Sequence, residues 1–476
     1  MTAGSAQRKA ARDGRLELTV LGIAVGLIAP FALVHLDDAD GVVYTVVARH
    51  LAQDGRLFDL RFLPGIFSHF REHPPFFFWV WALAIRLGSE QALPWIGAAC
   101  GLATLGIAFA LARELCNPRS AFLGAVALAT TESFFRYQAR PRLDPPLTLL
   151  FTACVALLVL ARGRARWLFA GGVAAGLGAL VKGPPALGAP VAAALALLAL
   201  GRGGELRRPK AWLLVAVPAL ALPAAFLAYN HLALGSTWWK GYVEGQFLAS
   251  ALGHRRDGAG DRIFLLRSTL GRLGPWSALA AVALVRAVRE RTTPRACAAW
   301  ALLAWAGVVV GGYSMAGRAW WHYAMPAYVP LALLAGLGLE DLLGWAGERA
   351  FGAFRTLATA AAVLLVAALP LRLARFVVKP CSIGSLPMLS AHLPPGTRVG
   401  LAADRLALVE AGILAHHAGL EAVPLRSPAE LVATTDLPRA LVDARWAVPS
   451  GWERVASQGD WMELRHGTEE PPTLAR

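Results

Sequence analysis

Long apolar stretches separated by short arginine-rich connections are the feature that most constrains this 476-residue chain. Hydrophobic residues make up 56% of the sequence and the mean hydropathy is +0.50, as in integral membrane proteins. Because a helix crosses a bilayer with about 20 apolar residues, the sequence predicts an all-α polytopic membrane protein with about 11 to 13 transmembrane helices. The apolar segments are approximately 16–35, 74–88, 92–112, 119–138, 143–160, 166–181, 183–200, 211–230, 274–288, 296–313, 319–339 and 354–373.

The net charge of +15 is concentrated in the connections between apolar segments, the pattern of positive-inside topology, and this distribution argues against nucleic-acid binding. All the basic connections fall on the cytoplasmic side if segment 74–88, which is short for a span, does not fully cross. The connections are 8–15, 112–119, 161–166, 201–210 and 286–295. The opposite face then carries a first outer loop (36–73), a second outer loop (231–273) and the C-terminal part of the chain.

We expect two domains: a multi-pass transmembrane domain over 1–378 and a small α/β domain outside the membrane over 379–476. In the second, TRVGLAADRLALVEAGILAHHAGL predicts a strand and then a helix, and RALVDARW and RVASQGDWMELR predict short strands. In the first outer loop, VVYTVVARHLAQDG has apolar residues at helical spacing. It predicts an amphipathic surface helix, with FLPGIFSHF as a candidate second one.

Carboxylates stand at three boundaries between apolar and polar sequence. They are Asp37, Asp38 and Asp40 after the first apolar segment, Glu72 before His73 and a proline pair, and Asp144 between Arg142 and two prolines. Each has a structural explanation: a solvated helix end, a helix start, or an ion pair with the neighbouring arginine. Because a carboxylate at an apolar boundary is costly unless it is solvated, paired or used, these residues are also candidate catalytic groups.

Basic and aromatic residues mark two further boundaries and the second outer loop. Lys182 precedes Gly183-Pro184-Pro185, and broken helices in membranes usually line cavities. It is either a snorkelling loop lysine or a phosphate-facing ammonium. Near another proline-marked boundary, interfacial anchoring and phosphate binding are both open for Arg318, His322 and Tyr323. The second outer loop adds candidates that a solvated loop would also explain: Lys240, Glu244 and His254.

The order of these motifs resembles the GT-C superfamily of membrane glycosyltransferases, in the branch of the protein O-mannosyltransferases and lipid A aminoarabinose transferases. Over about residues 16–340, the matching motifs are Asp40 through Tyr44, His73-Pro74-Pro75-Phe76, Arg142-Leu143-Asp144, Lys182-Gly183-Pro184, Pro275-Trp276-Ser277 and Arg318 through Pro326. The spacing from Tyr44 to Gly55 also matches and makes Asp40 the counterpart of the family's catalytic aspartate. Two positions depart from the pattern: Gly41 replaces an acidic residue, and His73 stands where the aminoarabinose branch has lysine.

The resemblance implies the GT-C fold and an inverting transfer of a sugar from a polyprenyl-phosphate donor by direct displacement. Asp40 would be the general base on an acceptor hydroxyl, or would orient the acceptor if that is already an anion. Asp144 would orient the acceptor or the base. The auxiliary carboxylates would be Asp37 or Asp38 beside Asp40, and Glu72 beside His73. The groups that bind the donor phosphate would be His73, Lys182, Arg318, His322 and Tyr323. No cofactor is required, although a divalent cation (Mg²⁺ or Mn²⁺) at Asp40 and Asp144 is compatible with the resemblance.

The acceptor stays open among lipid A, a protein hydroxyl and another cell-envelope glycan. We expect a bacterial inner-membrane protein with its active site and C-terminal domain in the periplasm, surrounded by membrane lipids and without a nucleic-acid partner. One alternative is a polytopic transporter or lipid flippase, which would explain charges beside broken helices but not carboxylates gathered on one face. Another is a non-catalytic scaffold, for which Asp40 and Asp144 would be dispensable.

Overall fold

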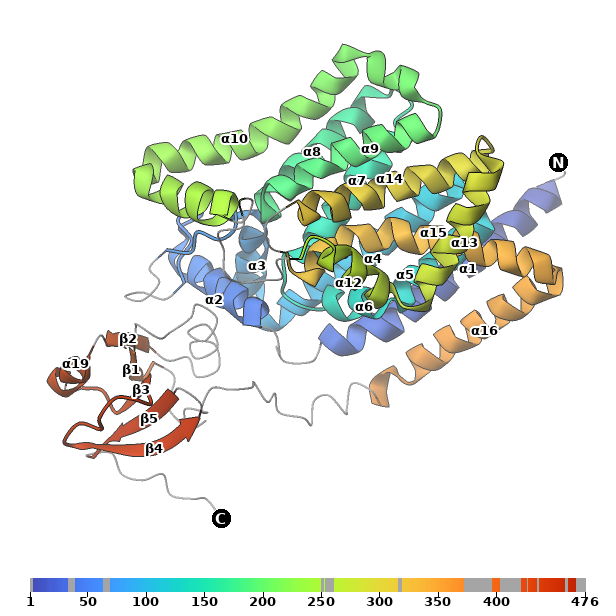
Figure 1. Ribbon diagram of the computed structural model, residues 1–476. Coiled ribbons are helices and arrows are strands. Elements are labelled where there is room, and N and C mark those ends of the chain that lie inside the picture. Colours follow the sequence, from blue (N-terminus) through green and yellow to red (C-terminus); the bar gives the residue numbers. More distant parts are fainter. Residues whose placement is uncertain are drawn as a thin grey trace. The chain divides into compact units, whose positions relative to one another are not determined.

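The computed structural model describes eleven stretches of the chain, which belong to two compact units (Figure 1). The described residues are 3–32, 39–62, 69–249, 252, 261–315, 319–371, 396–402, 421–425, 427–434, 436–458 and 461–467. The first unit draws on 1–33, 71–77 and 91–379, and the second on 34–70, 78–90 and 380–476. Most of the predicted transmembrane domain is therefore one unit, and the first outer loop is grouped apart from it.

The first unit is a bundle of helices. Its α-helices are α1 (Ala3–Ala32), α4 (Leu93–Leu115), α5 (Pro118–Thr130), α6 (Glu132–Gln138), α7 (Asp144–Leu160), α8 (Ala165–Lys182), α9 (Gly188–Ala199), α10 (Pro209–Trp239), α12 (Phe264–Leu273), α13 (Pro275–Glu290), α14 (Pro294–Ser314), α15 (Met325–Ala346) and α16 (Glu348–Ala367). Short 3₁₀ turns and one π-helix join them: η1 (Glu90–Ala92), η2 (Pro184–Leu187), η3 (Gly203–Arg207), η5 (Trp321–Ala324) and the π-helix η4 (Lys240–Leu248).

Proline and capping residues explain where several of these helices begin. Proline suits the first turn, where the backbone N–H has no intrahelical acceptor. In α5 the side chain of Asn117 accepts from the backbone N–H groups of Arg119 and Ser120. In α14 the side chain of Thr293 accepts from the N–H of Ala296. The sequence therefore sets these boundaries locally, before the helices pack.

Small residues allow the helices of the bundle to approach closely. A Cβ added to Gly336 of α15 would collide with the backbone of Gly124 in α5. Close backbone approach at glycine is typical of helix pairs in membranes, where van der Waals packing and not water exclusion drives association. In Figure 1, α8 and α9 lie between α10 and α14, and extensive contacts join α8 to α10 and α9 to α14.

Six helical segments of the described residues are long and apolar enough to cross a membrane by length and composition. They are Gly14–Ala32, Glu90–Leu115, Pro209–Ser236, Pro294–Ser314, Trp321–Ala346 and Glu348–Ala367. The sequence predicted about 11 to 13 spans, and part of the difference arises where apolar segments are broken. One break falls at Thr131, between α5 and α6, and another at Gly183, between α8 and η2. Segment 74–88 forms the twelve-residue helix α3 (Phe76–Leu87); at about 18 Å it is too short to cross.

The helical part of the second unit joins α2 (Ala39–Asp54) to most of α3. Tyr44 makes edge-to-face contacts with Phe70 and Phe78 and stacks on Trp81 at 6.3 Å. The helix predicted in the first outer loop is thus present, but residues 41–48 are all buried, which differs from an amphipathic surface helix. The aromatic neighbours of Tyr44 account for part of this burial. The candidate second helix lies mostly outside the described residues.

The C-terminal sheet has the strand order β2-β1-β3-β5-β4. Its elements are β1 (Arg398–Ala402), β2 (Glu421–Leu425), α19 (Pro428–Ala433), β3 (Arg439–Asp443), β4 (Trp452–Gln458) and β5 (Trp461–His466). Strand β1 pairs in parallel with β2 and β3, and β5 pairs antiparallel with β3 and β4. The strands predicted from RVGLA, RALVD and the last hairpin are confirmed, whereas β2 and α19 were not predicted. The helix predicted directly after β1 falls outside the described residues.

Candidate functional site

A buried ion pair lies where α7 begins and α8 ends. The ammonium of Lys182 donates to the Oδ1 of Asp144 at 2.6 Å, and these side chains are only 9% and 4% exposed. Asp144 occupies the first turn of α7, where the positive end of the helix dipole favours a carboxylate. Gly183 ends α8 with a φ of +89°, a conformation that glycine adopts without strain. The proline-rich turn after Lys182 thus holds the ammonium against the start of α7.

Arg142 adds a second cation next to this pair. Its guanidinium lies 4.0 Å from Asp144 Oδ2 and stacks over the ring of Tyr137 at 4.5 Å. Tyr137 also stacks on His322 at 5.9 Å. The Lys182 ammonium lies 5.1 Å from the centre of the Tyr323 ring. Two cations therefore face this one carboxylate in a largely buried place.

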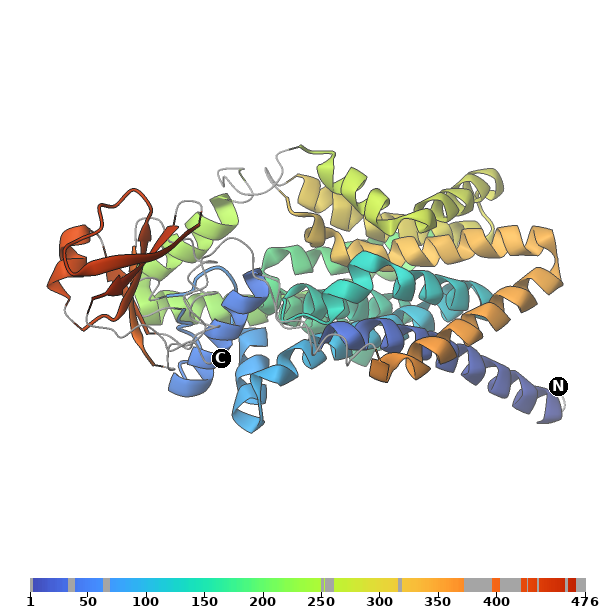
Figure 2. The same ribbon diagram turned by 90° about the horizontal axis from the view of Figure 1, so that it is seen from below.

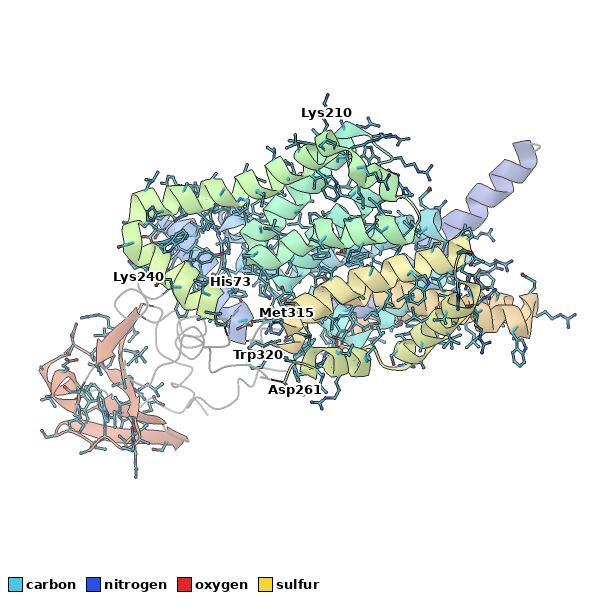
Figure 3. All side chains as sticks on the ribbon, turned by 45° about the horizontal axis from the view of Figure 1, so that its top comes forward. His73, Lys210, Lys240, Asp261, Met315 and Trp320 are labelled. Carbon is cyan, nitrogen blue, oxygen red and sulfur yellow. The ribbon has the colours of Figure 1, made fainter. Side chains whose placement is uncertain are left out.

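A cavity of about 540 Å³ opens beside Lys182, within the first unit. Its wall combines aromatic, aliphatic, proline and glycine residues with two charged side chains, one amide and one imidazole. The lining residues are Glu72, His73, Leu147, Phe151, Lys182, Gly183, Pro184, Pro185, Gly188, Val191, Tyr242, Gln246, Val308, Val309, Gly312, Tyr313, Met315, Tyr323 and Pro326. A mostly apolar pocket with a few convergent polar groups is the usual form of a ligand site. The cavity is marked in Figure 3 by the labels of His73 and Met315, which both line it.

The structure unites only part of the predicted site. Four predicted residues line the cavity and two lie behind its wall: Glu72, His73, Lys182 and Tyr323 line it, and Asp144 and His322 are buried behind. Asp40 and Tyr44 belong to the other unit. Lys240 and Glu244 are exposed on η4 and do not line the cavity. Four residues fall outside the described residues: Asp37, Asp38, His254 and Arg318.

Sequence reasoning missed several cavity residues and one supporting residue. Tyr242 and Gln246 of η4 line the cavity. The sequence pointed instead to Lys240 and Glu244, two positions before each of them. Tyr313 also lines it, and its ring lies 5.1 Å from that of Tyr323. Tyr137, which supports Arg142, stands five positions before it in the sequence. Aromatic residues beside motif charges were the available signal, but they are too common at membrane interfaces to single these out.

The described residues fit a metal ion poorly at Asp144. Both of its oxygens face cations, namely Lys182 and Arg142, which would repel a divalent ion. Across the described parts of both units, no group of three or more histidine, cysteine or acidic side chains is placed to hold a metal. A cation bound through Asp40 stays a prediction.

Comparison with known proteins supports the resemblance inferred from the motifs. Residues 72–229 match the family model of dolichyl-phosphate-mannose-protein mannosyltransferases. The fold matches ArnT from Cupriavidus metallidurans in the apo state, with a TM-score of 0.70, 17% identity and coverage of 95% of this chain and 98% of ArnT. The structure of ArnT from the same organism bound to undecaprenyl phosphate matches with a TM-score of 0.69 and 17% identity. That match covers 94% of this chain and 97% of ArnT.

A more distant match is the Archaeoglobus fulgidus oligosaccharyltransferase in the apo form, with a TM-score of 0.55 and 14% identity over 90% of this chain and 69% of that one. No curated protein sequence matches. The chain is therefore a multi-pass membrane protein with the GT-C fold that ArnT also has, and residues 72–229 are similar to the mannosyltransferase family.

Proposed function

We propose that this protein is an inverting glycosyltransferase that moves a sugar from a polyprenyl-phosphate donor to an acceptor at the outer face of the bacterial cytoplasmic membrane. The observation that carries the proposal is the apolar cavity with Lys182 in its wall and Asp144 and Arg142 behind it. A polyprenyl chain needs apolar walls, and its phosphate needs cations in a place of low dielectric constant, where they act strongly.

In this proposal the donor phosphate lies against Lys182, with His73 and Tyr323 on the same wall. Lysine has three N–H donors, and the hydrogen bond to Asp144 uses one of them. Asp144 then acts by holding the ammonium in place, and Arg142 lends positive charge from behind. Asp144 is a positioning residue in this arrangement and not a base, because its oxygens are already engaged with cations.

The transfer step needs a base outside this pair, and Asp40 is our candidate. The acceptor oxygen would attack the anomeric carbon while the bond from that carbon to the phosphate oxygen breaks. The electron pair of that bond would leave with the polyprenyl phosphate, and Asp40 would take the proton of the acceptor hydroxyl. Attack from the side opposite the leaving phosphate inverts the anomeric centre.

The family match to mannosyltransferases and the fold match to ArnT suggest a hexose or pentose as the sugar. The undecaprenyl phosphate bound by that ArnT supports a lipid-linked donor. The acceptor would be lipid A, a protein hydroxyl or another envelope glycan. We place the cavity and the C-terminal sheet domain (379–476) in the periplasm, where that domain would help to select the acceptor.

The test measures transfer of radiolabel from polyprenyl-phosphate sugars in membranes that contain the protein. Wild type should move label into an acceptor, and Asp40→Asn and Asp144→Asn should lose most of this transfer at equal protein level. Lys210→Met removes an exposed lysine outside the cavity and serves as the control. Transfer that survives both aspartate variants would contradict the assigned roles. Label that changes leaflet without leaving its phosphate would favour a flippase instead.

A further inference from the structure

A second and larger hollow, of about 1220 Å³, lies in the first unit among α1, α4 and the turn between α7 and α8. We propose that this groove binds one anionic phospholipid of the surrounding membrane. The juxtaposition that leads to the proposal is an apolar wall between helices and a rim of arginines: Arg15, Arg113, Arg162 and Arg164. The proposal does not depend on the glycosyltransferase function.

The groove lies at the opposite end of α7 and α8 from the candidate active site. Asp144 begins α7 and Leu160 ends it, and Leu160 lines the groove. A helix of 17 residues is about 25 Å long. The two hollows are therefore separated by most of the thickness of a bilayer, about 30 Å. The groove lies near the level of lipid headgroups on the far side. In Figure 2 the amino-terminal end of α1 diverges from the neighbouring helices.

The wall of the groove suits acyl chains. It is formed by leucine, valine and phenylalanine side chains of α1 and α4, among them Leu18, Leu21, Leu105 and Phe109. Leu18 and Leu21 are exposed although both are apolar. Free phosphate would gain nothing from this wall, whereas the acyl chains of a diacyl lipid would pack against it while the headgroup stays at the rim.

Four arginines at the rim stand against two carboxylates, Glu17 and Glu114, which also line the groove. Arg113 donates to Glu17 at 2.8 Å. Among the described side chains, no ion pair engages Arg15, Arg162 or Arg164. A neighbouring hollow of about 330 Å³ shares Arg162 and is lined otherwise by Arg202, Glu205 and Arg208. Basic pockets between transmembrane helices recognise anionic headgroups in this way.

The backbone of the α7–α8 turn independently indicates a functional role for Arg162, because this arginine occupies a position that favours glycine or asparagine. Arg162 has a φ of +46° and Gly163 a φ of +80°, and the N–H of Arg164 donates to the carbonyl of Ala161 at 2.9 Å. Left-handed conformations at both central positions favour glycine or asparagine, so an arginine there is strained. The turn directs a cation to the groove at the expense of local strain.

This strain makes a clean test available. Full-length protein is reconstituted in nanodiscs of mixed phosphatidylglycerol and phosphatidylcholine, and the lipid retained after release is identified by native mass spectrometry. Wild type should retain phosphatidylglycerol preferentially. Arg162→Gly should lower that preference about fivefold, which corresponds to about 1 kcal/mol per basic residue near an anionic surface. The triple variant Arg15→Gln/Arg162→Gly/Arg164→Gln should abolish it.

Arg291→Gly is the matched control. Arg291 also has a left-handed φ, +47°, is exposed and does not line the groove. Both glycine variants relieve strain, so thermal unfolding in pure phosphatidylcholine should occur at the wild-type temperature or above it. Equal loss of lipid preference in both variants, or no preference in wild type, would overturn the proposal. Displacement of the lipid by glycerophosphate, or a dimer that buries the groove, would also overturn it.

Discussion

The Asp144–Lys182 pair of the helical unit and the Arg439–Glu463 pair of the C-terminal sheet are both almost fully buried, yet their surroundings differ. Arg439 on β3 donates to Glu463 on β5 at 3.0 Å, with side-chain exposures of 3% and 1%. Lys182 is bound as closely to Asp144 but also lines a cavity, which neither Arg439 nor Glu463 does. Removing charges from water costs free energy in both places. Only at Lys182 is the cation placed where a ligand can meet it.

The largest effect should come from breaking the pair in the sheet. Arg439→Met leaves Glu463 buried without its guanidinium and should lower the free energy of unfolding of this domain by about 3–5 kcal/mol. The double variant Arg439→Met/Glu463→Leu removes both charges and should recover most of that loss. Protease susceptibility and thermal unfolding of the full chain measure both. If the double variant is no more stable than Arg439→Met, the loss of stability does not come from the buried charge of Glu463, and the prediction is wrong.

Breaking the membrane pair should have a different outcome. Lys182→Met should reduce sugar transfer about 100- to 1000-fold, the usual effect of losing one donor to a developing anion. The double variant Asp144→Asn/Lys182→Met should recover folded protein but not transfer, because the charge that meets the phosphate is still missing. Protein level and transfer are measured in the same membranes. Recovery of transfer in the double variant would make this pair structural, like the one in the sheet.

The smallest effect should sharpen the comparison at the turn after Lys182. Gly183→Ala places a Cβ at a φ of +89° and 3.5 Å from the Tyr242 hydroxyl. Gly201→Ala is matched, since its φ is +70° and no atom lies within 4 Å of the added Cβ. Each should cost about 1–2 kcal/mol of stability from backbone strain. Only Gly183→Ala should also raise the KM for the donor, severalfold, in a steady-state transfer assay. Equal KM values for the donor in the Gly183→Ala and Gly201→Ala variants would show that this turn does not contribute to donor binding.

Much of the helical architecture follows from the sequence because apolar length and proline position are local signals. Segments 143–160 and 166–181 were predicted within one residue of α7 and α8. The predicted segment 119–138 breaks at Thr131 into α5 and α6, which its composition does not reveal. In the C-terminal sheet β1 was predicted, but β2, an edge strand that contains Pro424, was not.

The site was harder to predict because its contacts join distant parts of the chain. Asp144 was expected to pair with Arg142, its neighbour in sequence, as the structural alternative to a catalytic role. In the structure Lys182, 38 positions away, is the closer partner. Periodicity and composition cannot supply that distance, because it depends on how α7 packs against α8. The placement of Asp40 beside this pair was implied by the resemblance alone and stays a prediction.

The π-helix η4 has a consequence for comparing this protein with its relatives. The family match ends at residue 229, shortly before the chain leaves α periodicity at Gly235 and winds as a π-helix from Lys240 to Leu248. In a π-helix each N–H bonds to the carbonyl five residues back, whereas in an α-helix it bonds four residues back. Each hydrogen-bonded turn of a π-helix therefore holds one extra residue. If a similar protein lacks that extra residue, its side chains after this point face in other directions, even where the aligned amino acids are the same. Residues of this protein and of ArnT are therefore best compared by their position on the cavity wall, where Tyr242 and Gln246 lie here, and not by their position in a sequence alignment.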